Sequence, residues 1–205
     1  MQLVVATTNA GKLAEIKRAL KGLPIEIVPL TGLGQWPEVI EDGKTFEENA
    51  LRKARTVADF FGTMALADDS GLEVDALGGA PGIHSARYSG EEADDARNNE
   101  KLLRALGGVP QERRGARFVC VLAVSSPASP EGKEWLFRGE CEGWIAFAPR
   151  GEHGFGYDPI FFYPPLGRTF GEIDRKTKGL VSHRGKALEK LRQALPGLLH
   201  LESNP

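Results

Sequence analysis

Short apolar runs and helical repeats alternate along the first third of the chain. The continuous apolar run of residues 2–6 predicts a buried strand, since strands covered on both faces lack polar alternation. Apolar residues at helical spacing predict a helix over residues 12–21, and residues 25–29 indicate a second strand. Thr45-Phe46-Glu47-Glu48 has the form of a capping box, which predicts a helix running to about Phe61.

The rest of the chain adds strands and two helices. Residues 64–67 predict a strand that ends at the adjacent acids Asp68 and Asp69, and residues 72–74 either continue it or begin a short new one. Further elements are predicted as a helix over 92–106, strands over 117–125 and 134–148 with a turn-rich segment over 126–132, and a helix over 182–195 stopped by Pro196-Gly197.

This order of elements predicts an α/β fold with an elongated mixed β-sheet flanked by helices. We expect one domain over residues 1–205, with two lobes that do not fold independently and a central substrate cleft between them. The hairpin of strands 117–125 and 134–148 could form the second lobe.

Composition narrows the class of protein. The 205 residues suffice for a large core, and no apolar stretch is long enough to span a bilayer. The first residues lack the basic start and apolar core of a signal peptide, so we expect none. Cys120 and Cys141 lack metal-ligand spacing, so we expect buried free thiols and a cytoplasmic location. The net charge of -2 gives no reason to expect nucleic acid or membrane as a partner. Locally, residues 38–48 are acidic and residues 168–192 are basic, which suits a metal and a triphosphate or merely marks two solvated faces.

The loop between the first strand and helix has the chemistry of a phosphate site. Thr7, Thr8 and Asn9 offer short polar groups, Gly11 allows close approach of the backbone, and Lys12 adds a positive charge. The loop matches neither of the common glycine-rich nucleotide motifs, and an ordinary capping turn remains the alternative.

The acids Asp68 and Asp69, followed by Ser70-Gly71, suggest a metal site. Hard carboxylate oxygens suit Mg²⁺, and one carboxylate can hold the metal while another takes a proton from water. Glu38 and Glu41 upstream are further candidate ligands. A turn in which the acids only cap backbone groups is the alternative.

Three later segments carry candidate binding groups. The first, Gly154-Phe155-Gly156-Tyr157-Asp158-Pro159, predicts either an exposed Phe155 ring on which a base stacks or a turn with a core aromatic residue. The second comprises Lys178 and the later Ser182-His183-Arg184. Its donors suit a carbonyl or phosphate oxygen of a ligand, and the alternative is that these side chains only lie at the surface. The third, the glycine-rich residues 78–90, predicts a long shaped loop in which Arg87 could face a cleft or a second subunit.

Taken in order, these blocks resemble the inosine triphosphate pyrophosphatase family over residues 3–194. The resemblance is carried by seven segments: Thr8-Asn9-Ala10-Gly11-Lys12, Thr45-Phe46-Glu47-Glu48-Asn49-Ala50 with Lys53-Ala54, Ala67-Asp68-Asp69-Ser70-Gly71-Leu72, Gly78-Gly79-Ala80-Pro81-Gly82, Ser85-Ala86-Arg87-Tyr88, Gly154-Phe155-Gly156-Tyr157-Asp158-Pro159 and Ser182-His183-Arg184.

The resemblance implies a homodimeric enzyme that hydrolyses XTP, ITP and dITP to monophosphate and pyrophosphate with Mg²⁺. It implies that Asp69 is the catalytic proton acceptor and that Glu41 and Asp69 hold the metal. The substrate-binding residues that it implies are Thr7, Thr8, Asn9, Ala10, Gly11, Lys12 and Lys53 for the phosphates, then Ser70, Phe155, Gly156, Tyr157, Asp158, Lys178, His183 and Arg184. Among these, Phe155 would stack on the base, and His183 and Arg184 would read its 6-oxo edge.

Two positions depart from the family pattern. Ile40 stands where many relatives have a second acid, which leaves Glu38 or Asp68 as candidate helpers of Glu41. Thr8 stands where relatives often have glycine, which restricts the loop backbone. Two other functions stay open: a nucleoside triphosphate pyrophosphatase of broader specificity, and a nucleotide-binding sensor without turnover.

Overall fold

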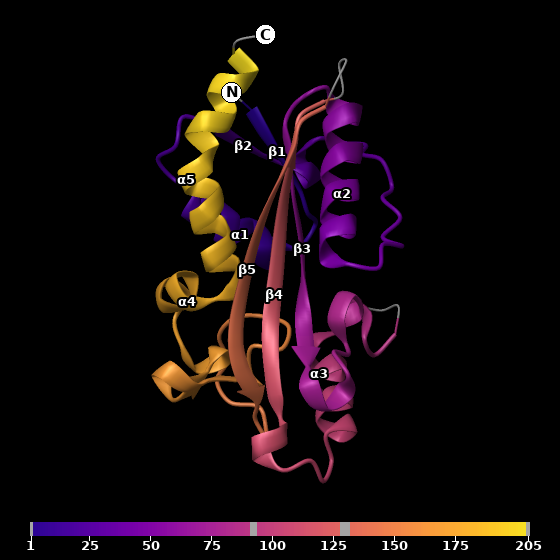
Figure 1. Ribbon diagram of the computed structural model, residues 1–205, viewed down its shortest axis with the longest axis vertical. Coiled ribbons are helices and arrows are strands. Elements are labelled where there is room, and N and C mark those ends of the chain that lie inside the picture. The colour runs from indigo at the N-terminus through magenta and orange to yellow at the C-terminus, as the bar shows by residue number, and fades with distance from the viewer. Residues whose placement is uncertain (1, 91–93, 128–131, 204–205) are drawn as a thin grey trace. The chain divides into compact units, whose positions relative to one another are not determined.

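The protein, described here from a computed structural model, forms one hydrogen-bonded sheet with helices against it (Figure 1). All residues are described except 1, 91–93, 128–131 and 204–205, and residues 199–203 are described by their backbone alone. The strand order is β2-β1-β3-β4-β5-β6-β7, in which β1 pairs in parallel with β2 and β3 while β6 pairs antiparallel with β5 and β7. The strands are β1 (Gln2–Ala6), β2 (Glu26–Pro29), β3 (Ala65–Val74), β4 (Gly115–Ser125), β5 (Glu134–Ile145), β6 (Phe161–Tyr163) and β7 (Arg168–Thr169). The predicted mixed α/β sheet is therefore confirmed.

Five α-helices lie among the described residues: α1 (Ala10–Ala19), α2 (Phe46–Phe61), α3 (Asp95–Ala105), α4 (Arg175–Val181) and α5 (His183–Ser203). Helix α2 begins where the capping box predicts, because the Thr45 side chain accepts the N–H of Glu48. In a capping box, the glutamate side chain also accepts the backbone N–H of the N-cap residue, here Thr45. That second bond is replaced, because the Glu48 carboxylate accepts the N–H of Lys44.

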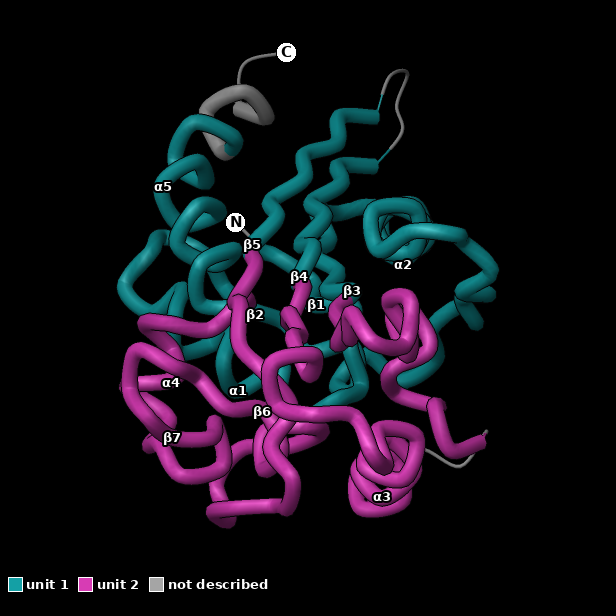
Figure 2. Tube along the Cα trace, turned by 60° about the horizontal axis from the view of Figure 1, so that its bottom comes forward, with its two compact units in different colours: residues 1–69, 120–139, 184–205 teal, residues 70–119, 140–183 magenta. Residues whose placement is uncertain are grey.

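The chain divides into two compact units, which Figure 2 colours separately. Unit 1 comprises residues 1–69, 120–139 and 184–205, and unit 2 comprises residues 70–119 and 140–183. The predicted hairpin is not a lobe of its own, because the unit boundaries fall inside β4 and β5 and leave its tip in unit 1. The expected cleft stays a prediction.

In unit 1, alternation along the central strands sends side chains to two opposite faces of the sheet. Leu3 and Val5 of β1, together with Met64 and Leu66 at the start of β3, belong to a core that also contains apolar residues of α1 and α5. Helix α2 lies on the other side of these strands (Figure 1), where its Ala50, Ala54 and Val57 are buried. Successive residues of β3 therefore meet different helices.

Unit 2 has its own core, which is rich in aromatic rings. Phe118 of β4 stacks parallel to His183, with ring centroids 4.5 Å apart, and packs against Phe161 and Phe170. Leu102 of α3 and Leu106 at its C-cap belong to the same core. Both cysteines are buried free thiols, as expected, with Cys120 in unit 1 and Cys141 in unit 2.

Several predicted boundaries are wrong. The strand predicted over residues 64–67 does not end at the acids but runs through them as a single β3, so residues 72–74 continue it, which was one of the two alternatives. Helix α1 begins at Ala10 rather than Lys12, because Asn9 acts as its N-cap. Helix α5 continues through Pro196 instead of stopping there, and Leu198 beyond the proline is buried in the unit 1 core. Helix α4 was not predicted.

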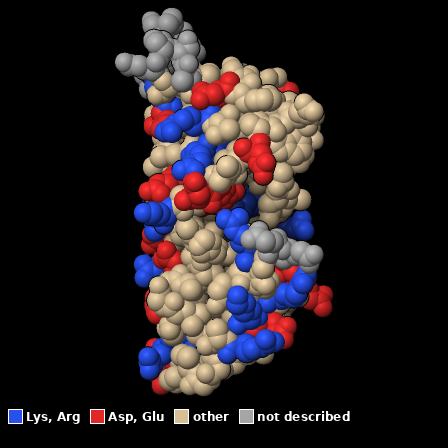
Figure 3. Space-filling view, turned by 90° about the vertical axis from the view of Figure 1, so that its right-hand side faces the viewer, with Lys and Arg blue, Asp and Glu red and all other residues tan. Residues whose placement is uncertain are grey.

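Other features match the expectations more closely. Residues 78–90 form a loop in which several glycines have positive φ and residues Gly82–Arg87 form a 3₁₀ helix. The first residues of the helix expected from 92, and part of the turn expected over 126–132, lie outside the described residues. Within the described part of the chain no helix is long and apolar enough to cross a membrane. Figure 3 shows acidic and basic side chains interspersed over the face that carries α2.

Candidate active site

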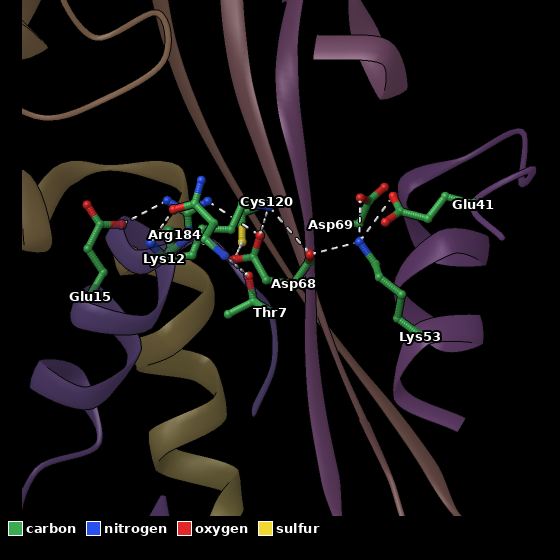
Figure 4. A network of polar contacts seen from close by, with 10 residues as sticks. Thr7, Lys12, Glu15, Glu41, Lys53, Asp68, Asp69, Cys120 and Arg184 are labelled. Atoms are coloured by element: carbon green, nitrogen blue, oxygen red, sulfur yellow. Dashed lines mark hydrogen bonds and ion pairs between the residues drawn. The ribbon is translucent and has the colours of Figure 1, made fainter. Parts of the chain in front are cut away.

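The candidate site in unit 1 is built around the point where β3 carries Asp68 and Asp69 (Figure 4). Because strand side chains alternate, Asp68 shares the face of Leu66 and Asp69 shares the face of Ala67. Asp68 therefore meets α1 and α5, and Asp69 meets α2. Both are buried, with exposures of 2% and 6%.

On the first face, Asp68 is held by two cations. Lys12 Nζ lies 2.7 Å from its Oδ1, and Arg184 Nε donates to its Oδ2 over 2.7 Å. Arg184 also donates to Glu15 through Nη1, and the Cys120 thiol donates to Asp68 Oδ2 at 3.3 Å. Burial alone would raise the pKa of Asp68, but Arg184 and Lys12 outweigh it and hold that pKa well below its ordinary value. Asp68 is therefore a buried carboxylate whose negative charge is matched by two cations.

On the opposite face, Lys53 of α2 lies between two carboxylates. Its Nζ is 2.9 Å from Asp69 Oδ1 and 3.4 Å from Glu41 Oε2, and it also donates to the backbone oxygen of Asp68 at 3.1 Å. Burial raises the pKa of Asp69, and Lys53 opposes that rise only in part. For Lys53, burial lowers the pKa, but the attraction of Asp69 and Glu41 prevails and the net shift is upward.

The second oxygen of Asp69 is the atom in this cluster that best fits a metal ligand. Asp69 Oδ2 is buried and has no hydrogen-bond partner among the described residues, although a buried carboxylate oxygen normally has one. Together with the nearby oxygens of Glu41, it offers the hard donors that Mg²⁺ prefers when water and substrate phosphates complete its shell. The described residues contain no group of three or more His, Cys, Asp or Glu side chains that could hold a metal alone.

The predicted phosphate loop shows the geometry of a helix N-terminus. Asn9 Oδ1 accepts the N–H of Lys12, and the first intrahelical bond runs from Leu13 to Asn9. The N–H groups of Ala10 and Gly11 precede that bond, in the first turn where backbone donors attract anions. Thr7 Oγ1 accepts the N–H of Asn9 and so shapes the turn, while Thr8 is exposed.

Unit 2 brings together the residues expected to hold the base. The Lys178 ammonium lies 4.5 Å from the centroid of the Phe155 ring and 2.5 Å from Asp158 Oδ2. Asp158 Oδ2 also accepts the N–H of Phe155. The Tyr157 hydroxyl donates to the Ser85 carbonyl at 2.8 Å, so Tyr157 is a buried support of the loop.

Ser70, His183 and Arg184 complete the set expected from the sequence. Ser70 follows Asp69 in β3 and is half-buried. His183 is buried against Phe118, and Arg184 is 2% exposed with its guanidinium directed at Asp68 and Glu15. Glu15 was not foreseen, although its position three residues after Lys12 on α1 places both on one helix face.

A family model, curated relatives and solved structures all match most of this chain. The model of the Ham1 family matches residues 3–194. A dITP/XTP pyrophosphatase of Syntrophobacter fumaroxidans is 55% identical over 197 residues, which cover 96% of this chain and 83% of the relative. One from Geobacter sulfurreducens is 54% identical over 95% of this chain and 96% of its own. The structure of a HAM1 protein from Coxiella burnetii superimposes with a TM-score of 0.87 at 44% identity, over 96% of this chain and 99% of that one.

Proposed function

The chain belongs to the Ham1 family, and we propose that it hydrolyses the deaminated purine nucleoside triphosphates XTP, ITP and dITP to monophosphate and pyrophosphate. Such a reaction keeps these nucleotides out of DNA and RNA. The observation that carries the proposal is the Lys53 cluster, in which a lysine joins Asp69 and Glu41 while Asp69 Oδ2 has no hydrogen-bond partner among the described residues. An anionic substrate that brings a divalent cation suits this set of groups.

The metal in the proposal is Mg²⁺, with Glu41 and Asp69 as its protein ligands. Bound there, Mg²⁺ supplies neutralisation of the charge on the phosphate oxygens. Two carboxylates are enough for this ion, since it keeps several waters and binds substrate phosphates directly. Glu38 and Asp68 were the candidate helpers, and the pairing of Asp68 with Lys12 and Arg184 favours a structural role for it.

Asp69 is the proposed proton acceptor of the hydrolysis. A water molecule attacks the α-phosphorus in line, Asp69 takes a proton from it, and the bond to pyrophosphate breaks. Lys12 and Lys53 balance the charge that grows on the phosphate oxygens.

The triphosphate in this proposal binds Thr7, Thr8, Asn9, Ala10, Gly11, Lys12 and Lys53. The base stacks on Phe155, in the loop that includes Gly156, Tyr157 and Asp158, and Ser70, Lys178, His183 and Arg184 supply further contacts. Donors from His183 and Arg184 would select a 6-oxo group over the 6-amino group of adenine, because a mismatched polar contact is strongly disfavoured. The proposal further includes a homodimer and a cytoplasmic location.

Pyrophosphate release from a panel of nucleotides tests the proposal. With Mg²⁺ present, we expect the purified protein to convert XTP, ITP and dITP far faster than dUTP, GTP or ATP. Comparable rates on all six would instead indicate a pyrophosphatase of broad specificity. Tight binding of ITP without any pyrophosphate release would indicate a nucleotide sensor and contradict the enzyme.

A further inference from the structure

Helix α3 holds both polar backbone groups of Gly156, which lies between the candidate base-binding residues Phe155 and Tyr157. Asp95 Oδ2 accepts the N–H of Gly156 at 2.6 Å, and Asn99 Nδ2 donates to its carbonyl oxygen at 3.0 Å. Asp95 and Asn99 are four residues apart on one helix, so both side chains lie on one helix face. Neither residue belongs to a sequence motif that marks the candidate site.

The peptide that they hold needs such a restraint. Gly156 has a φ of 63°, a left-handed conformation that glycine adopts easily and also leaves easily. The bond from the Phe155 N–H to Asp158 Oδ2 closes the loop on itself, Lys178 holds Asp158, and the Ser85 carbonyl holds Tyr157. These contacts fix residues on either side of Gly156, but they do not reach its peptide groups. The two contacts from α3 attach the loop to a helix that is anchored in the unit 2 core through Leu102 and Leu106.

Asn99 is an unfavourable residue for stability at its position. It is 7% exposed, and its Oδ1 atom is buried without a hydrogen-bond partner among the described residues. An unsatisfied buried amide oxygen costs free energy that an apolar side chain would not. The amide orientation is set by Gly156, since a flipped amide would place two acceptor oxygens together. What the amide contributes is therefore its contact with the loop.

We propose that Asp95 and Asn99 are positioning residues that clamp Gly156 and so hold the Phe155 ring in place for the purine base. The role in substrate binding rests on the proposed function, whereas the clamp itself does not. A loop fixed before binding spares the substrate the cost of ordering it. Because the base is held in the ground state and in the transition state alike, losing the clamp raises KM and leaves kcat nearly unchanged.

Four variants test the clamp. Asp95→Ala and Asn99→Leu each remove one contact, and Asp95→Asn retains an acceptor oxygen at the same place. Glu100→Ala is the matched control, because Glu100 lies on the exposed side of α3 and pairs with Arg104. For each, we would measure kcat and KM for ITP, the thermal midpoint, and the exchange rate of the Gly156 amide proton in the protein without nucleotide.

The loss of one net hydrogen bond should raise KM about fivefold in Asp95→Ala and in Asn99→Leu. Asp95→Asn and Glu100→Ala should keep the KM of the parent protein. Asn99→Leu should change the thermal midpoint little, since removal of the unsatisfied Oδ1 offsets the lost bond to the Gly156 carbonyl. Gly156 amide exchange should accelerate most in Asp95→Ala, which removes the acceptor of that proton, and stay unchanged in Glu100→Ala.

The outcomes separate the two proposals. Unchanged Gly156 exchange in Asp95→Ala would overturn the clamp, and so would a lowered thermal midpoint with unchanged KM in Asn99→Leu. If the parent protein releases no pyrophosphate from ITP, the proposed function fails, and faster Gly156 exchange in the variants would still support the clamp.

Discussion

Asp68 and Asp69 are adjacent in β3, yet their carboxylates lie on opposite faces of the strand and contact different lysines. Lys12 reaches Asp68 from α1 and Lys53 reaches Asp69 from α2, and both ammonium groups also approach the backbone oxygen of Asp68. Strand alternation thus gives two neighbouring acids different environments. Asp68 is compensated by cations, whereas Asp69 retains a buried oxygen without a hydrogen-bond partner among the described residues.

The first prediction concerns the charge of Asp69. Asp69→Asn keeps the side-chain volume and an oxygen that can accept from Lys53, so the fold should persist. Turnover should fall by about 100-fold or more, the scale of a lost general base. Pyrophosphate release from ITP and the thermal midpoint measure the two effects. A rate close to that of the parent protein would remove Asp69 from the role of proton acceptor.

The second prediction concerns stability. Asp68→Ala leaves Lys12 and Arg184 near a vacated buried site, and the free energy of unfolding should fall by about 3–5 kcal/mol. Asp42→Ala is the control, because Asp42 pairs with Arg52 at the surface, where both side chains are well exposed. An exposed pair contributes less than about 1 kcal/mol. Equal losses in denaturant unfolding would contradict the proposed structural role of Asp68.

The third prediction concerns selectivity. Arg184→Ala should lower the ratio of kcat/KM for ITP over ATP by about tenfold or more if Arg184 is the proposed donor to the 6-oxo group. Arg184 is also bonded to Asp68 and Glu15, so the variant will be less stable. The ratio of two substrates on one preparation is independent of the folded fraction. An unchanged ratio would assign recognition of the 6-oxo edge to other residues.

Local patterns predicted the elements well because short-range physics determines them. Thr45 marks the start of α2 through a bond to a residue three positions away, and the apolar run of residues 2–6 marks β1. The end of α5 could not be predicted in this way. Pro196 is a local signal for the end of a helix. The helix nevertheless continues past it, and Leu198 beyond the proline is buried in the unit 1 core.

In the candidate site, too, sequence blocks point to individual residues but not to their long-range contacts. Asp69 and Lys53 could be singled out from sequence blocks, but the pairing of Asp68 with Arg184 joins residues 116 positions apart. No periodicity reports such a contact, because it depends on how α5 packs beside β3. The contacts of Asp95 and Asn99 with Gly156 are equally non-local, which is why the sequence drew attention to the loop and not to its support.

The fourth prediction is a pH dependence at α4, the helix that carries Lys178. Asp174 caps it, and the hydroxyl and N–H of Thr177 donate to its carboxylate, which lowers the pKa of Asp174 to about 2 from an ordinary 3.8. Because the folded pKa is depressed, the charged cap contributes fully above pH 3.8 and is lost as the pH falls toward 2. The carboxyl carbon shift of Asp174 in NMR should titrate near 2, and a midpoint near 3.8 would contradict the cap.

The last prediction concerns the metal. If Glu41 and Asp69 hold Mg²⁺, a chelator should abolish pyrophosphate release and added Mg²⁺ should restore it. Glu41→Gln removes one charged ligand, so the Mg²⁺ concentration for half-maximal rate should rise at least about tenfold. Loss of a residue that only hydrogen-bonds to a metal ligand already lowers metal affinity by about that factor. Asp42→Asn is the matched control, because the neighbouring Asp42 faces Arg52 at the surface. Equal Mg²⁺ requirements in the two variants would exclude Glu41 as a ligand. A raised requirement in Glu41→Gln alone would assign the metal to the Lys53 side of β3, where Asp69 Oδ2 is buried without a hydrogen-bond partner among the described residues.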